Sequence, residues 1–500
     1  MTTSTSLLIF SFFIASSNAA GVNGLPVPVP LVARAAANCY PTTPNSTGGT
    51  LSTVIKMGTT ANGFTGPARG WNSWGVQGSP KTTPSYPSSL APYVNQTFVI
   101  EQCSVLAGDA YIAAGYDLCS IDGKWYSSVT DDYGRVTYNT SLFDMPTLGT
   151  YLHDLGLKLG VYSLPGIPCE AANKTIYGTS TLVSEAFSGV EGTDGTCFFN
   201  HSSPYTQVYY NTLVALWASW GVDMVKLDYL TPGSSIGSLG YPTNSSLSAS
   251  AFHTAIANSG RAIRLDLSSN VCRDAPYLNI WASSTESIRL RQVGFVGMWL
   301  VQNTIEQYQQ YINQLVYAGS ASFSLHPDMD DLFIANPASV TGVTDGQRIT
   351  LMSHWIGAGA NLILGSDMTN VDDLGLQLIT SDASVAAANF CGTYPMQPRN
   401  PGTGSNQPIQ LQAWVSGPSD DGEAYVLLTN LGTNLGKGGY VTVGSGNLTV
   451  SATLDDLGLT GAIYNVTDVW TGGKSQVSVG GGFSSVLDVG ESTFLHLVLA

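Results

Sequence analysis

The chain has 500 residues, more than one hydrophobic core usually organises, so its length favours two domains. Its formal net charge of −16 argues against nucleic acid or an anionic membrane surface as a partner. An apolar fraction of 43% with 55 glycines is typical of a globular, loop-rich protein.

The N-terminus has the features of a secretory signal peptide. Residues 7–15 (LLIFSFFIA) form an apolar run too short to span a bilayer, and the small residues SSNAAG follow it. No lysine or arginine precedes the run, so a membrane anchor or a buried N-terminal strand is the alternative. We predict a signal peptide over residues 1–20, a linker or pro-segment over 21–60, and a secreted, extracellular protein.

The N-glycosylation sequons and the cysteines are consistent with a secreted protein. Because the export route is oxidising, Cys169 and Cys197, which flank one predicted loop region, are the expected disulfide. Seven cysteines leave at least one thiol free or paired outside the chain. No cysteine pair has zinc-finger spacing and the six histidines are scattered, so we expect neither a metal nor a cofactor. N-linked glycans are expected at Asn45, Asn95, Asn139, Asn173, Asn200, Asn244, Asn447 and Asn465.

Between residues 69 and 367, short β-rich segments alternate with segments of helical apolar spacing, such as 205–221. The gap between the fifth and sixth segments is too short for a full helix. This alternation predicts an α/β fold, a (β/α)8 TIM barrel over residues 61–395, with an open doubly wound sheet as the alternative. The predicted strands are 69–74, 116–122, 158–163, 224–229, 263–268, 278–284, 323–328 and 361–367.

A Pro/Gly/Asn-rich linker at 395–408 ends the alternating pattern. Short alternating strands joined by Gly-rich turns follow it and predict a C-terminal antiparallel β-sandwich over residues 396–500. The sandwich could bind polysaccharide. It shows no strip of aromatic residues that would form a binding platform, so we expect an accessory domain packed on the barrel.

In a TIM barrel, catalytic side chains stand at the carboxyl ends of the strands. The sequence places carboxylates and aromatic residues at these ends, without a Ser–His or Cys–His pair. Two carboxylates can cleave a glycosidic bond, and aromatic faces pack on sugars, so the pattern indicates carbohydrate chemistry. The candidates are Trp74, Asp122, Lys124, Trp125, Tyr162, Lys226, Asp228, Asp266, Ser268, Glu286 and Asp328.

Each candidate also has a structural explanation. Lys226 and Asp228 are two residues apart, so they share one face of a strand and could form a buried ion pair. The recurrence of acidic residues on several strand ends favours a functional site instead. For the remaining candidates, the structural roles are helix capping for Asp122, core packing for Trp71, Trp74 and Trp125, solvent exposure for Glu286, and an acidic loop for residues 326–332.

Motifs at the predicted strand ends follow one another along the chain: GWNSW (70–74), IDGKW (121–125), LGVYS (159–163), VKLDY (225–229), HPDM (326–329) and ILGSDM (363–368). Together they resemble glycoside hydrolase family 27, the melibiase-type α-galactosidases. The likeness begins near residue 67 and reaches the C-terminus, because AWVSGPSDDGEAYVLLTNLG and VTDVW are similar to that family's C-terminal sandwich.

The resemblance implies a retaining double displacement on a carbohydrate substrate. The family's nucleophile falls on Asp228, and Lys226 would contact sugar hydroxyls and help keep Asp228 ionised. The family's acid/base lies in a W-R-x-x-x-D stretch, matched here by WASSTE, which assigns the role to Glu286. In a retaining enzyme the two carboxyls stand about 5–6 Å apart, and the acid has a raised pKa. The implied sugar contacts are Trp74, Asp122, Lys124, Tyr162, Lys226, Ser268, Arg289 and Asp328.

The chain departs from the family where the sugar is recognised. Asp122 is followed by Gly123 instead of a second aspartate, which in the family helps hold the sugar's O4 and O6. Ala282 stands in place of the motif arginine, for which Arg289 or Arg291 could substitute, and Leu267-Ser268-Ser269 replaces Cys-Glu-Trp. We therefore expect a secreted α-galactosidase-like hydrolase. The alternatives are the same mechanism on N-acetylgalactosamine or β-L-arabinopyranose, or a sugar-binding relative without catalysis.

Overall fold

The computed structural model describes residues 39, 54–78, 94–234, 238–291, 298–317, 322–399, 409–434, 440–441 and 446–500. The predicted signal peptide, most of the predicted linker and the sequon at Asn45 lie outside these residues. Residues 56–57 of that linker form β1 (Lys56–Met57), which pairs with β13 (Ser322–Phe323) in a two-stranded sheet separate from the barrel sheet.

Eight parallel strands form the central sheet, in the order β14-β12-β11-β10-β6-β3-β2-β15. The backbone N–H of Asn361 donates to the carbonyl of Pro327 (3.0 Å), which joins the two edges and closes the barrel. The prediction of a TIM barrel is thus confirmed. The strands are β2 (Arg69–Asn72), β3 (Leu118–Ile121), β6 (Lys158–Ser163), β10 (Val222–Leu227), β11 (Arg264–Leu267), β12 (Ser287–Arg289), β14 (His326–Asp328) and β15 (Leu362–Leu364).

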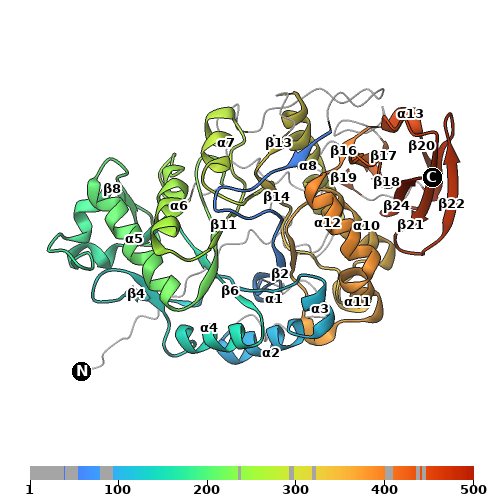
Figure 1. The fold of residues 1–500 in the computed structure, drawn as a ribbon. Coiled ribbons are helices and arrows are strands. Elements are labelled where there is room, and N and C mark those ends of the chain that lie inside the picture. The colour runs from blue at the N-terminus through green and yellow to red at the C-terminus, as the bar shows by residue number, and fades with distance from the viewer. Residues whose placement is uncertain are drawn as a thin grey trace, which may run out of the picture.

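Helices surround the strands (Figure 1). Their starts follow capping rules: Ser203 caps α5 before Pro204, and Thr344 with Gln347 forms a capping box on α10. No helix among the described residues has both the length and the apolarity to cross a bilayer. The main helices are α2 (Gln96–Leu106), α4 (Met145–Asp154), α5 (Pro204–Ser219), α6 (Leu247–Ser259), α7 (Ala275–Ala282), α8 (Met298–Tyr317), α10 (Asp345–Gly357), α11 (Asp373–Thr380) and α12 (Asp382–Thr393).

The predicted sixth strand, 278–284, is wrong. These residues lie mostly in helix α7, where Pro276 occupies the first turn and Trp281 is fully buried, its Nε1 donating to the carbonyl of Cys272 (2.8 Å). The aromatic and β-branched content of LNIWASS suggested a strand, but packing against the barrel wall selected a helix. The sixth strand is β12, so Glu286 precedes a strand instead of following one.

Two short sheets extend from the connections near the carboxyl end of β6 and β3. One pairs β4 (Tyr126–Thr130) with β5 (Val136–Tyr138). The other has the order β7-β9-β8, from Gly166–Pro168, Thr196–Phe199 and Phe187–Glu191. The predicted Cys169–Cys197 disulfide is confirmed and ties this second sheet together. Further disulfides join Cys103 with Cys119 and Cys39 with Cys272, and Cys391 is the odd thiol, buried and outside any disulfide.

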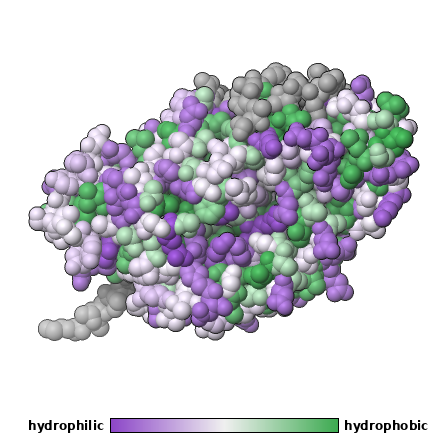
Figure 2. All heavy atoms as spheres, in the orientation of Figure 1, coloured by the Kyte–Doolittle hydropathy of each residue, from purple (hydrophilic) through white to green (hydrophobic). Residues whose placement is uncertain are grey.

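The C-terminal region is antiparallel, as predicted. A seven-stranded sheet is faced by the two-stranded sheet β20-β23 (Leu448–Thr453 and Gly482–Leu487), with Leu428 and Val450 in the shared core. It packs on the barrel, since the indole N–H of Trp470 donates to Ser353 Oγ on α10 (2.8 Å). The larger sheet contains β16 (Gln397–Pro398), β17 (Ile409–Ser416), β18 (Ala424–Asn434), β19 (Tyr440–Val441), β21 (Ile463–Asp468), β22 (Lys474–Ser478) and β24 (Glu491–Leu499). On the face of the molecule shown in Figure 2, hydrophilic residues gather near the centre and hydrophobic ones are scattered.

Candidate active site at the barrel mouth

The carboxyl ends of β3 and β10 meet through a buried ion pair. Lys226 Nζ lies 2.6 Å from Asp122 Oδ2, and both side chains are almost fully buried. An ion pair of Lys226 with Asp228, which their spacing in the sequence allowed, is therefore wrong. Asp122 does not cap a helix either, because its carboxylate accepts from Lys226 and from the N–H of Gly123 (2.8 Å). The pair fixes the end of a long lysine side chain at the barrel mouth.

Asp228 stands directly after β10 and is half-buried. Its backbone N–H donates to the carbonyl of Ser163 (2.9 Å), and its Oδ1 accepts from the N–H of Tyr229 (2.8 Å). Burial raises the pKa of Asp228, and the positive charges of Lys226 and Arg289 oppose that rise. Tyr229 has a left-handed backbone (φ 54°), which is rare for a bulky residue and often marks a functional site.

Tyrosine rings line the mouth beside Asp228. Tyr162, at the end of β6, is buried, and its phenol pKa is raised by burial and by the nearby charge of Asp228. Its ring is parallel to that of Tyr126, with 6.4 Å between the ring centroids. Trp125, in contrast, is core: it is fully buried and its Nε1 donates to the carbonyl of Tyr162 (2.9 Å).

Trp74 differs from its neighbour Trp71. Trp71 is fully buried and donates to the carbonyl of Ser366 (2.9 Å), so it belongs to the core. Trp74 follows β2 at the start of the short helix α1 (Trp74–Gln77) and keeps part of its ring exposed. Of the two, only Trp74 is accessible to a sugar at the barrel mouth.

Arg289 organises the opposite side of the mouth. It ends β12 and pairs with two carboxylates, Asp328 and Asp330, each at 2.6 Å. Asp266 lies deeper, accepts from the hydroxyl of Ser287, and has a pKa raised well above its usual value by burial and by Asp328. Asp331 is also buried, and burial with the charge of Asp330 raises its pKa to about 8. Within residues 326–332, the sequence predicted only Asp328 as a site residue. Asp330 and Asp331 were not predicted.

Ser268 and Lys124 are placed differently. Ser268 is buried, and its N–H donates to the carbonyl of Leu227 (2.8 Å), which sets it level with Asp228 at the end of the neighbouring strand. Lys124 is exposed and has a left-handed backbone (φ 80°) in the turn after β3. Ser268 therefore lies beside the nucleophile candidate, whereas Lys124 belongs to the rim.

Glu286 is not at the mouth, which corrects its placement from sequence. It precedes β12, and its carboxylate accepts from the N–H of Leu265 near the start of β11 and from the N–H of Asn62 (3.0 Å) and Oγ1 of Thr60 (3.3 Å). Asp228 lies about three residues, or roughly 10 Å, further along the strands. Burial raises the pKa of Glu286 to about 7, as expected for the acid. At this distance, however, Glu286 cannot face Asp228 across a substrate.

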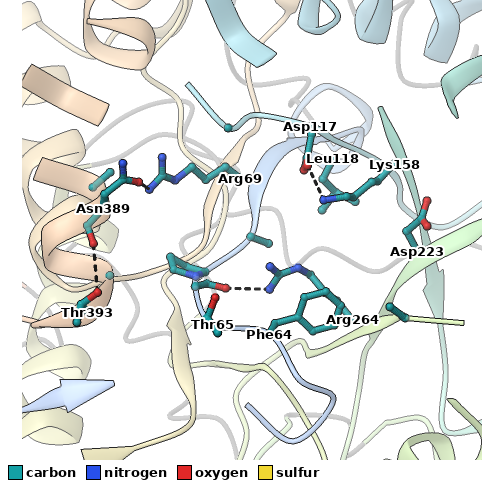
Figure 3. A pocket seen from close by; sticks show the side chains of 17 residues that line it. Phe64, Thr65, Arg69, Asp117, Leu118, Lys158, Asp223, Arg264, Asn389 and Thr393 are labelled. Atoms are coloured by element: carbon teal, nitrogen blue, oxygen red, sulfur yellow. Dashed lines mark hydrogen bonds and ion pairs between the residues drawn. The ribbon is translucent and has the colours of Figure 1, made fainter. Parts of the chain in front are cut away.

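A cavity also lies at the amino ends of the strands. Its volume is about 520 Å³, and Figure 3 shows Arg69, Asp117, Lys158, Asp223 and Arg264 around it. These residues begin or precede β2, β3, β6, β10 and β11, at the end of the barrel opposite Asp228. None of the predicted site residues lines this basal cavity, so we do not regard it as the catalytic pocket.

The mouth of the barrel thus gathers several carboxylates, two fixed cations, and partly exposed aromatic rings. Such a constellation hydrogen-bonds sugar hydroxyls, packs on sugar rings and offers a carboxylate for attack at an anomeric carbon. In a TIM barrel, active sites occupy this end of the strands. Fold and site together define the class as an enzyme that acts on carbohydrates.

Comparisons with known proteins identify the family. The model of the alpha galactosidase C-terminal beta sandwich domain matches residues 409–495, and that of alpha galactosidase A matches 67–191. "Putative alpha-galactosidase 8" of Emericella nidulans is 52% identical over 81% of this chain and 82% of that protein. Alpha-galactosidase 3 of Hypocrea jecorina is 46% identical over 92% of this chain and 75% of that protein. The chain belongs to glycoside hydrolase family 27, the melibiase-type α-galactosidases.

A solved structure shares the fold. The β-L-arabinopyranosidase of family 27 from Geobacillus stearothermophilus aligns with a TM-score of 0.71 and 21% identity, covering 87% of this chain and 98% of the other. The alignment spans both the barrel and the sandwich, since it leaves little of either chain uncovered. The expectation of a family 27 glycoside hydrolase with a C-terminal sandwich is confirmed.

Proposed function

We propose that the protein is a secreted, retaining hydrolase that removes terminal α-linked galactose from oligosaccharides or polysaccharides. The observation that carries this proposal is the position of Asp228, which directly follows β10 at the barrel mouth beside Lys226 and Tyr162. The names of the two closely similar relatives support galactose as the sugar.

In this mechanism Asp228 is the nucleophile. Its carboxylate bonds to the anomeric carbon while the glycosidic bond breaks and the leaving oxygen takes up a proton, and water then hydrolyses the glycosyl ester. Lys226 and Arg289 supply positive charge that favours the ionised form of Asp228 against the cost of burial. Trp74, Tyr162, Asp122 and Ser268 surround the place for the sugar ring, and Asp328 is held by Arg289 on the far side.

Secretion and glycosylation are part of the same proposal. Three disulfides among the described residues suit an oxidising compartment. The sequon asparagines within the described residues are exposed or half-exposed, as glycan attachment requires: Asn95, Asn139, Asn173, Asn200, Asn244, Asn447 and Asn465.

The glycone is tested by hydrolysis of nitrophenyl glycosides in mildly acidic buffer. The α-galactoside, α-N-acetylgalactosaminide, β-L-arabinopyranoside and α-glucoside are compared with wild type, with Asp228→Asn, and with Asp117→Asn at the basal cavity as the control. We expect release from the α-galactoside with retention of configuration, loss in Asp228→Asn, and wild-type rates in the control. If nitrophenol is released from only one of the other glycosides, that glycoside's sugar is the substrate instead of galactose. If the protein binds sugar but hydrolyses none of the glycosides, it is a sugar-binding protein and the proposed enzymatic function is wrong.

A further inference from the structure

The sixth strand supplies no general acid. Counting the W-R-x-x-x-D motif from Arg289, which the structure places at the end of β12, puts Val293 at the acid position. No Asp or Glu occurs between Glu286 and Glu306. Every Asp and Glu of the chain lies among the described residues, so the partner of Asp228 can be sought among known positions.

Most acidic residues near the mouth are already engaged or face the interior. Asp122 is held by Lys226, and Asp328 and Asp330 are held by Arg289. Asp266 and Asp331 line a narrow cavity inside the barrel, which Lys226, Arg289 and Asp328 also line. A general acid has to touch the glycosidic oxygen, which points away from the barrel interior toward the leaving group.

Asp194 meets this requirement. It lies in the turn between β8 and β9, is half-exposed, and forms no ion pair with any described residue. Its Oδ2 accepts from the hydroxyl of Tyr241 (2.7 Å), and its Oδ1 accepts from the N–H of Thr196 (3.1 Å). The hairpin turn is anchored further by the N–H of Thr193, which donates to the carbonyl of Leu239 (2.8 Å).

Aromatic contacts connect Asp194 with Asp228. The ring of Tyr241 meets the ring of Tyr229 edge to face, with 6.4 Å between centroids, and Tyr229 is bonded through its N–H to Asp228. The phenol of Tyr126 lies close enough to Asp122, Asp194 and Asp228 that all three negative charges add to the effect of burial in raising its pKa. Asp194 and Asp228 therefore belong to one cluster of tyrosines, formed by Tyr126, Tyr229 and Tyr241.

We propose that Asp194 is the general acid/base of the reaction, supplied by the β8–β9 hairpin in place of the sixth strand. In the first step its proton moves to the glycosidic oxygen while the bond from that oxygen to the anomeric carbon breaks and Asp228 bonds to the carbon. In the second step the Asp194 carboxylate takes a proton from water as the water oxygen attacks the same carbon. The ester bond then breaks, and its electron pair returns to Asp228. This assignment rests on the proposed retaining function.

Leaving-group dependence is the first test. Asp194→Ala should lower kcat/KM for a substrate with an unactivated sugar leaving group by about 100- to 10,000-fold. The dinitrophenyl glycoside of the same sugar needs little protonation and should lose far less. Glu191→Ala, an exposed carboxylate on the same hairpin, is the matched control and should leave both rates unchanged. Equal losses on both substrates, or no loss, would overturn the assignment.

Azide rescue gives a second, stereochemical test. Azide needs no base, so it should restore turnover of the dinitrophenyl glycoside by Asp194→Ala and give a glycosyl azide with the configuration of the substrate. An Asp228→Ala variant should instead give the opposite anomer, because azide replaces the nucleophile. If wild type hydrolyses neither substrate, the proposed function fails as a whole. If wild type is active but azide has no effect on Asp194→Ala, only the role of Asp194 fails.

Discussion

Lys226 and Asp122 form a 2.6 Å ion pair that links the fourth strand of the barrel to the second. Asp228, two residues after Lys226, lies outside this pair, and its Oδ1 accepts from the backbone N–H of Tyr229. The lysine thus acts on Asp228 through its charge and not through direct contact. Lys226 therefore has two roles: it pairs directly with Asp122, and its charge lowers the pKa of Asp228 from a distance.

Lys226→Met should lower both stability and activity. It leaves Asp122 buried without its cation, which typically costs about 3–5 kcal/mol in the free energy of unfolding. It also removes a positive charge that lowers the pKa of Asp228. Because Asp228 must be ionised to attack, the acid limb of kcat/KM should move to higher pH. Denaturant unfolding and a pH–rate profile measure the two effects, and an unmoved acid limb would contradict the electrostatic role.

Tyr229→Gly should separate stability from function. Tyr229 has a left-handed backbone, which costs a residue with a Cβ atom about 1–2 kcal/mol of conformational free energy. Glycine adopts the same backbone without this cost. The free energy of unfolding should therefore change little or rise, whereas loss of the ring beside Asp228 and Tyr241 should lower kcat/KM. Thermal unfolding and steady-state kinetics are the measurements. A variant that is both less stable and fully active would show that the ring is only a packing element.

Glu286→Gln should change the pH dependence of stability and not the chemistry. The pKa of Glu286 is raised by burial to about 7, above that of an unfolded glutamate. Its contribution to stability is then fully present below the unfolded pKa and is lost as pH rises through the folded pKa. Glutamine cannot ionise, so the fall in unfolding free energy between mild acid and neutral pH should become shallower. The kcat of the folded variant should stay near wild type, and a kcat reduced by orders of magnitude would return Glu286 to the mechanism.

Removing the Cys169–Cys197 disulfide should loosen the sheet that carries Asp194. The bond closes a loop with a sequence separation of 28 residues, for which the chain-entropy model gives about 3–4 kcal/mol. Replacing both cysteines with serine should lower the unfolding temperature and increase proteolysis within residues 166–199. Cys391→Ser, which removes the buried free thiol, serves as the comparison for the effect of a Cys-to-Ser change in the core. Proteolysis spread evenly over the barrel would argue against local loosening.

The barrel and most of its mouth were predictable from sequence because their signals are local. Apolar runs that end in a carboxylate predicted the strand-end positions of Asp122, Lys226, Asp228 and Asp328, since the carboxyl ends of parallel strands share one edge. The sixth strand was not predictable, because β12 has only three residues and the preceding helix is rich in aromatic and β-branched side chains. That error moved Glu286 to the wrong end of the barrel.

Long-range contacts account for what remained hidden. The sequence around Arg289 does not predict its ion pairs with Asp328 and Asp330, which are about forty positions away. Asp194 sits in a polar turn that looks like any surface hairpin, and only its bond to Tyr241 brings it toward Asp228. The spacing of one motif could have helped: Arg289, rather than Ala282, fits the arginine of the family pattern.

The bond between Cys39 and Cys272 sets an order of events for the maturing chain. The two cysteines are 233 positions apart. In the proposed export route, Cys39 therefore stays unpaired in the oxidising compartment until the fifth strand and the segment after it have been translocated. Any protease that trims the N-terminal segment must also stop before residue 39, or Cys272 would emerge as an unpaired thiol. The Cys39–Cys272 disulfide therefore sets both the earliest point at which the barrel can be cross-linked and the limit to which the N-terminal segment can be removed without exposing a thiol.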